Sequence, residues 1–176
     1  MFLTEMSFKE LFNIHKKDNL IKLYKIRIIS NFRSAVLQLK AIIDDDYDIC
    51  NNQLKGWTRL TMGYRGIGFN NGVYSNLKTK QTVNKNNKEI TFDHVIGATL
   101  CGEVVKEVIQ TSNYNHSYLI NNWLFDNLYL WGTIKVTKKQ HNKNNILRNK
   151  NSLTEKNNLD HYKNITINDL ITDKKL

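Results

Sequence analysis

The chain of 176 residues contains no proline and only two cysteines, Cys50 and Cys101. Two cysteines cannot build a disulfide framework or a zinc site made of cysteine pairs, so we expect both to be small buried thiols. Long hydrophobic runs are also missing, because Lys and Arg interrupt stretches such as residues 20–29. No membrane span is expected. Glu5 and Glu10 lie in a first segment without a clean apolar stretch, which argues against a signal peptide.

Acidic residues are scarce relative to basic ones. The chain has 26 Lys and Arg against 16 Asp and Glu, a formal net charge of +10. Such an excess on a small protein predicts a polyanionic partner, most often nucleic acid, and a solvated basic surface is the alternative interpretation. The one acidic cluster, within residues 43–52, is interpreted as a solvated turn or helix cap rather than a metal site. The length predicts one domain that buries a core without disulfides.

The N-terminal half carries two helical patterns. Residues 4–15 predict a short helix with Phe8 and Phe12 on one face. Residues 18–43 predict a longer helix, in which the β-branched run at 26–29 leaves a break or a strand open. This region is therefore expected to be mainly helical.

A glycine-rich stretch follows at residues 54–74. Asn71–Gly72 is a hairpin signal there. Arg59 and Arg65 are interleaved with aromatic residues, a mixture that suits nucleic-acid contact through stacking and phosphate binding, although aromatics beside glycines also pack in cores. Residues 78–88 are polar and basic, and we expect an exposed loop.

The pattern that carries chemistry begins at residues 89–92, which alternate as a strand does and lead into Asp93 and His94. Successive side chains of a strand point to opposite faces, so the two can take different roles. A carboxylate binds hard divalent cations through oxygen, and an imidazole with its ordinary pKa of about 6.5 can accept a proton from water. Residues 127–136 predict one further strand or two short ones.

A helix is predicted directly after that second stretch. Thr137 and Gln140 match a capping box, which places the helix start at Lys138. His141 then falls in the first turn and Asn145 follows one turn later on the same face, so the two could converge on one ion.

Basic residues surround this helix, and no acid occurs between positions 135 and 150. A solvated helix face is the usual meaning of such a run, and contact with nucleic-acid phosphates is the functional one. The candidate DNA-binding residues here are Lys135, Lys138, Lys139, Lys143 and Arg148.

The order of strand, Asp-His, strand, and helix with His and Asn resembles the ββα-metal motif of HNH (His-Me finger) endonucleases. The resemblance is carried by FDHVIG (92–97), DNLYL (126–130) and VTKKQHNKNN (136–145). It covers roughly residues 89–150 and lacks the zinc-binding cysteine pairs of many relatives.

The resemblance implies a role for each matching residue. Asp93 and His141 would hold a divalent ion, with Asn145 as a further ligand or phosphate contact, and His94 would be the general base. The ion implied is magnesium, with manganese or zinc as alternatives.

The residue that orients the base is implied to be Asn127. The gap that separates it from the Asp-His pair is long for the family and contains a predicted helix at 98–110. Asn121 and Asn122 are therefore kept as alternatives.

The expected architecture is α+β. A ββα-metal core spans 89–150 with an insertion at 98–122. A mainly helical region at 1–88 would hold DNA, and a tail at 151–176 would pack on the core.

The resemblance implies a phage-type enzyme that works in the cytoplasm of a bacterial host and hydrolyses duplex or single-stranded DNA. Two other hypotheses stay open. One is a non-catalytic basic protein that binds nucleic acid. The other is a metal-independent ribonuclease that uses His94 and His141 as an acid–base pair.

Overall fold

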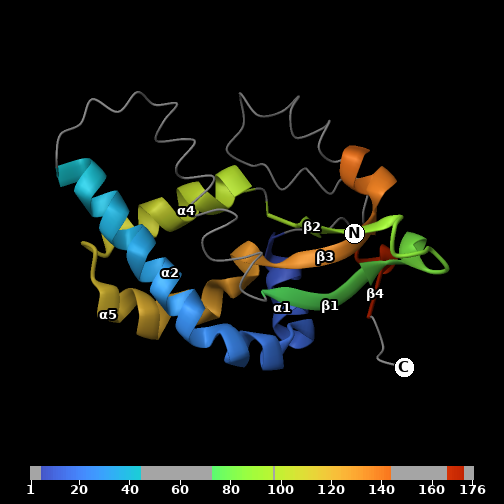
Figure 1. Cartoon of the computed structure of the whole chain (residues 1–176), viewed down its shortest axis with the longest axis horizontal. Helices are drawn as coiled ribbons and strands as arrows, with labels where there is room; N and C mark the ends of the chain where they lie inside the picture. The colour runs from blue at the N-terminus through green and yellow to red at the C-terminus, as the bar shows by residue number, and fades with distance from the viewer. Residues whose placement is uncertain (1–4, 45–72, 97, 144–165, 173–176) are drawn as a thin grey trace. The chain divides into compact units, whose positions relative to one another are not determined.

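The computed structural model describes residues 5–44, 73–96, 98–143 and 166–172 (Figure 1). The fold is α+β, as the sequence predicts, with a four-stranded sheet and several helices. The chain divides into two compact units that are described separately below. A sheet unit contains the first helix and all four strands, and a helical unit contains the remaining long helices. The predicted domain boundaries stay a prediction.

The first two helices confirm the sequence patterns. α1 spans Glu5–His15 and α2 spans Asp18–Asp44. α2 runs without a break through the β-branched residues 26–29. Tertiary burial of one helical face outweighs the weak helix propensity of such residues.

The sheet has the order β2-β3-β1-β4. β1 spans Tyr74–Thr79, β2 Ile90–His94, β3 Thr133–Thr137 and β4 Leu170–Thr172. β2 and β3 pair antiparallel, β3 and β1 pair parallel, and β1 and β4 pair antiparallel. The two strands that flank the candidate site are thus neighbours although a long helical segment separates them in sequence.

The core of the sheet unit joins α1 to the sheet. Phe8 and Phe12 are fully buried with ring centroids 5.9 Å apart, and Ile134 and Val136 of β3 are fully buried as well. α1 is fastened to β1 where Lys16 forms an isolated bridge with Ser75. The apolar face of α1 therefore stabilises the sheet that carries the site.

We expect Phe12→Ala to lower the free energy of unfolding by about 3–5 kcal/mol, because it removes a fully buried aromatic ring. Ile14→Ala is the matched control, since Ile14 lies on the same helix and is 71% exposed. Chemical denaturation of both variants measures the difference. Equal stability of the two variants would contradict this packing of α1.

The helical unit contains α2, α4 (Ala98–Thr111), α5 (His116–Tyr118), η4 (Leu119–Leu124) and η5 (Phe125–Trp131). α4 confirms the predicted helix at 98–110.

Aromatic residues fill the core of the helical unit. Phe32 stacks on Trp123 with ring centroids 6.1 Å apart, and Trp123 meets Trp131 edge-on. Cys101 of α4 is buried too, as expected, and burial raises the pKa of its thiol strongly, which makes it a poor nucleophile.

The predicted strand at 127–136 is wrong over its first half. Residues 127–131 belong to the 3₁₀ segment η5, and the strand begins at Thr133. The cause is the run from Leu128 to Trp131, in which every residue is buried. A short run that is apolar on all sides has no period, so sequence alone cannot distinguish a strand from a helix there.

β1 was not predicted, and residues 78–79 belong to it rather than to the expected loop at 78–88. Its sequence, YSNLKT, has one aliphatic residue, but Ser75, Leu77 and Thr79 alternate inward and are buried. Ser75 Oγ donates to the carbonyl of Thr133 at 2.6 Å, which satisfies a buried hydroxyl between the strands. The rest of the predicted loop is a short 3₁₀ turn, η3 (Lys80–Thr82), in which Thr82 is buried, followed by residues 83–88, which are exposed as predicted.

Several predictions fall on residues that the structure does not describe. These are Cys50, most of the acidic cluster at 43–52, and the glycine-rich stretch up to residue 72. The described part of the tail forms η7 (Ile167–Asp169) and β4. Among the described helices, none combines the length and apolar character that crossing a membrane requires.

Candidate functional site

The candidate site is built on the β2–β3 pair and on the helix that follows it. Asp93 lies opposite Ile134, and His94 lies opposite Thr133. Helical backbone begins at Lys138, directly after β3, and extends to residue 143 within the described part of the chain. Two antiparallel strands and a helix are therefore adjacent in space. Along the sequence, the helical segment 98–131 separates the two strands.

The predicted capping box fixes the start of this helix. Thr137 Oγ1 accepts from the Gln140 amide nitrogen at 3.2 Å, and Gln140 Oε1 accepts from the Thr137 amide nitrogen at 3.0 Å. Gln140 Oε1 also accepts from Thr79 Oγ1 of β1 at 2.8 Å. The capping box was predicted from the sequence, but the hydrogen bond from Thr79 was not. The alternating small hydroxyl residues of YSNLKT could have indicated a strand with a buried donor at Thr79. The side-chain carbonyl of Gln140 thus connects the start of the helix to β1, one of the two central strands of the sheet.

The structure brings Asp93 and His141 together, as the sequence predicts. His141 Nδ1 lies 3.2 Å from Asp93 Oδ1. The carboxylate is fully buried, and the imidazole is 29% exposed. A buried carboxylate is costly without a partner, which a protonated imidazole or a cation supplies.

The separation of the two atoms fits a shared ion. Two ligand atoms about 2.1 Å from one ion lie about 3.0 Å apart at adjacent octahedral positions and about 3.4 Å apart at tetrahedral ones. The observed 3.2 Å falls between these values. Within the stretches that the structure describes, no third His, Cys, Asp or Glu completes a metal-holding group. The carboxylate and a remaining shell of waters suit magnesium, and the imidazole also admits manganese or zinc.

His94 is the next residue of β2 and is only 2% exposed. It faces Thr133 across the strand pair, and the Thr133 carbonyl is held by Ser75 Oγ. Strand pairing therefore holds the backbone of His94 at the end of the β2–β3 pair, and its side chain is buried there. Sequence reasoning missed Ser75 and Thr133 as its surroundings.

Asn127 lies in η5, so the predicted strand position of this residue is wrong. Its Nδ2 donates to the Trp123 carbonyl at 2.8 Å, so the side-chain amide stabilises a local turn of the helical unit. Asn121 Nδ2 donates to Ser117 Oγ at 3.3 Å, and Asn122 is exposed. The base-orienting role of an asparagine stays a prediction.

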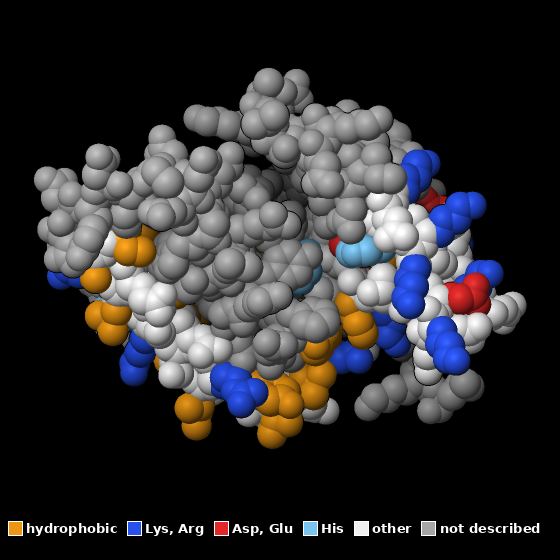
Figure 2. Space-filling view, turned by 45° about the horizontal axis from the view of Figure 1, so that its top comes forward, with side chains coloured by type: hydrophobic (Ala, Val, Ile, Leu, Met, Phe, Trp, Pro, Cys, Tyr) orange, Lys and Arg blue, Asp and Glu red, His pale blue; other side chains and the backbone are white. Residues whose placement is uncertain are grey.

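The basic residues of the helix are solvent-facing. Lys138, Lys139 and Lys143 are exposed. Lys135 of β3 is half-buried, with its Nζ 5.9 Å from the centre of the Phe92 ring. Figure 2 shows histidine surface on one face of the molecule and blue cationic side chains nearby on the right of the view. Four candidate residues lie outside the described parts of the chain: Arg59, Arg65, Asn145 and Arg148.

Comparison with known proteins found no matching family model, no matching curated protein and no matching solved structure. A function for this chain is therefore inferred from the geometry of its own residues.

Gln140→Ala is expected to act on both stability and metal use. It removes a helix cap worth about 1 kcal/mol, and it removes a hydrogen bond that fixes the residue before His141. If Asp93 and His141 hold a metal ion, as the resemblance implies, its affinity should fall about 10–100-fold, the range typical of partners that orient metal ligands. Magnesium titration and thermal melting measure the two effects.

The control is Asn142→Ala, an exposed position on the same helix. It should change neither quantity appreciably. A Gln140→Ala variant that melts earlier but keeps the parental magnesium requirement would reduce Gln140 to a helix cap.

Proposed function

We propose that this protein is an HNH-type endonuclease that hydrolyses DNA phosphodiester bonds with a divalent cation. The observation that supports this most is the 3.2 Å contact of Asp93 Oδ1 with His141 Nδ1 on a strand–strand–helix scaffold. A carboxylate and an imidazole from different elements meet there, next to a second histidine.

In this proposal two residues hold the ion and a third accepts a proton. Asp93 and His141 hold the cation, which when bound supplies Lewis-acid stabilisation of negative charge on the phosphate. His94 accepts the proton of the attacking water, a role in which a positioned imidazole typically contributes about 10²- to 10⁴-fold. The exposed lysines of the helix attract and position the phosphate backbone.

Plasmid nicking tests the proposal. The purified protein should convert supercoiled plasmid to the nicked form with magnesium or manganese, and EDTA should stop the reaction. Absence of nicking with magnesium, manganese and zinc alike would overturn the proposed hydrolysis.

A second candidate function is non-catalytic binding of nucleic acid. The 2% exposure of His94 favours it, because a general base must reach a water molecule. This function predicts salt-sensitive DNA binding without cutting.

The metal-independent ribonuclease is separated by the same assay. It predicts cleavage of an RNA substrate in EDTA and 2′,3′-cyclic phosphate ends. Metal-dependent nicking of DNA would exclude it, because DNA lacks the 2′-hydroxyl that attacks the phosphate in that reaction.

A further inference from the structure

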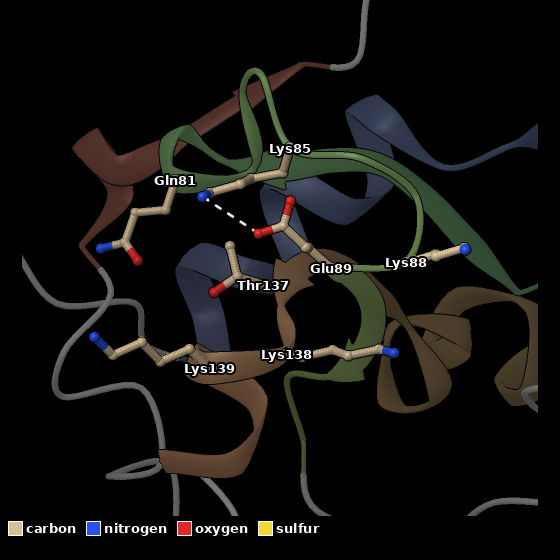
Figure 3. Close-up of a pocket in the computed structure, with 7 residues that line it drawn as sticks. All are labelled: Gln81, Lys85, Lys88, Glu89, Thr137, Lys138 and Lys139. Carbon is tan, nitrogen blue, oxygen red and sulfur yellow. Dashed lines mark ion pairs between the residues drawn. The ribbon is translucent and has the colours of Figure 1, made fainter.

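A pocket of about 490 Å³ lies between the β1–β2 connection and the start of the 138–143 helix (Figure 3). Four lysines line it. Lys85 and Lys88 come from the connection, and Lys138 and Lys139 come from the first turn of the helix. Two segments far apart in sequence thus place cationic side chains around one hollow.

Backbone hydrogen bonds hold the two walls of the pocket together. The amide of Lys138 donates to the carbonyl of Glu89 at 2.8 Å, and Ile90 pairs with Thr137 directly beside it. Within the connection, the amide of Lys85 donates to the carbonyl of Thr82 at 3.2 Å. The main chain that carries the lysines is therefore fixed in place, even though the side chains reach into solvent.

The polar ends of the side chains are distributed along the pocket. In Figure 3, Gln81 and Lys139 extend to one side, and Lys88 and Lys138 extend to the other. Between them Lys85 Nζ pairs with Glu89 Oε1 at 3.4 Å. Cationic groups at both ends, separated by a neutral ion pair, match two phosphates of one chain better than a single small anion.

We propose that this groove binds the sugar–phosphate backbone of the DNA strand beside the phosphate that is cut. Lys88 and Lys138 hold one phosphate, and Lys139 with Gln81 holds another, as ammonium groups acting as point charges. This inference rests on the proposed function for its ligand and extends it to residues on the β1–β2 connection.

The groove is separate from the Asp93–His141 pair but lies on the same scaffold. Three residue steps along β2 separate Ile90 from Asp93, which is about 10 Å at about 3.3 Å per residue. A DNA strand that crosses the Asp93–His141 pair would therefore also reach the groove.

Binding of a labelled DNA duplex in EDTA, followed by fluorescence anisotropy over a range of salt concentrations, tests the groove. Lys88→Ala, Lys138→Ala and Lys139→Ala should each weaken binding and each reduce the slope of log K against log salt by about 1. Lys80→Ala is the matched control, because Lys80 is an exposed lysine of the same connection that faces Asp169 and does not line the pocket. Groove variants that match Lys80→Ala in both quantities would overturn the proposal.

Glu89→Gln supplies the opposite test. It removes the one negative charge of the pocket and releases Lys85 from its ion pair, so binding should tighten and the salt slope should steepen by about 1. The backbone carbonyl that accepts from Lys138 is kept, so the fold of the walls is preserved. A Glu89→Gln variant with the parental affinity would contradict a phosphate track at this place.

The same variants in the nicking assay separate the two proposals. If no metal supports nicking and the lysine variants still lower the salt slope, the groove stands and the hydrolysis fails. If nicking occurs and the lysine variants bind and cut like Lys80→Ala, the hydrolysis stands and the groove fails.

Discussion

His94→Ala is expected to slow plasmid nicking by about 10²- to 10⁴-fold while leaving DNA affinity unchanged. The reason is that the substitution removes the only group on the β2 end that we assign to accept the proton of water. Anisotropy measures binding, and single-turnover nicking in saturating magnesium measures the rate. Because magnesium is already saturating, a further rise in its concentration should not restore the rate of the variant.

His94 is almost fully buried, so its replacement by alanine also leaves a cavity and lowers the stability at the end of the β2–β3 pair. His94→Gln fills a similar volume and keeps polar groups, so its melting temperature should stay close to that of the parent while nicking still falls. His116→Ala, in α5 of the helical unit, is the control for loss of an imidazole elsewhere. Undiminished nicking by a folded His94→Gln variant would remove His94 from the proposed chemistry.

Asp93→Asn is expected to raise the magnesium concentration for half-maximal nicking by about 100-fold or more. A carboxylate is the preferred oxygen ligand for magnesium, and loss of a ligand should exceed the roughly 10–100-fold effect seen for residues that only orient ligands. The amide has nearly the same shape, so it fills the fully buried position of the carboxylate. Nicking at a series of magnesium concentrations measures the shift.

Asp126→Asn removes an exposed carboxylate from η5 and is the matched control. His141→Ala should also shift the magnesium requirement, and the double variant with Asp93→Asn should be less than additive because both residues act on one ion. Fully additive shifts, or a parental magnesium curve for Asp93→Asn, would show that the pair is a structural contact.

The sequence predicted the parts of the fold that local patterns specify. Both N-terminal helices have clear helical periodicity, and the Thr137–Gln140 capping box located the helix start at Lys138, as found. The Asp93–His141 contact was implied by the resemblance to HNH endonucleases, because local signals place each residue only on its own strand end or helix turn.

The features that could not be predicted from the sequence depend on contacts between residues far apart in the chain. β1 is a polar segment whose buried hydroxyls are satisfied only by residues brought from β3 and the 138–143 helix, such as the Thr133 carbonyl and Gln140. Asn127 was assigned to a strand because its neighbours form an apolar run without a period. The pocket arises from the pairing of Ile90 with Thr137, which no local pattern specifies.

A crystal structure of the protein soaked in manganese, with anomalous scattering used to locate the ion, tests most directly whether Asp93 and His141 hold a cation. We expect an anomalous peak about 2.1–2.3 Å from both Asp93 Oδ1 and His141 Nδ1, and its loss in Asp93→Asn crystals. Manganese located elsewhere, with the carboxylate and the imidazole still in direct contact, would contradict it.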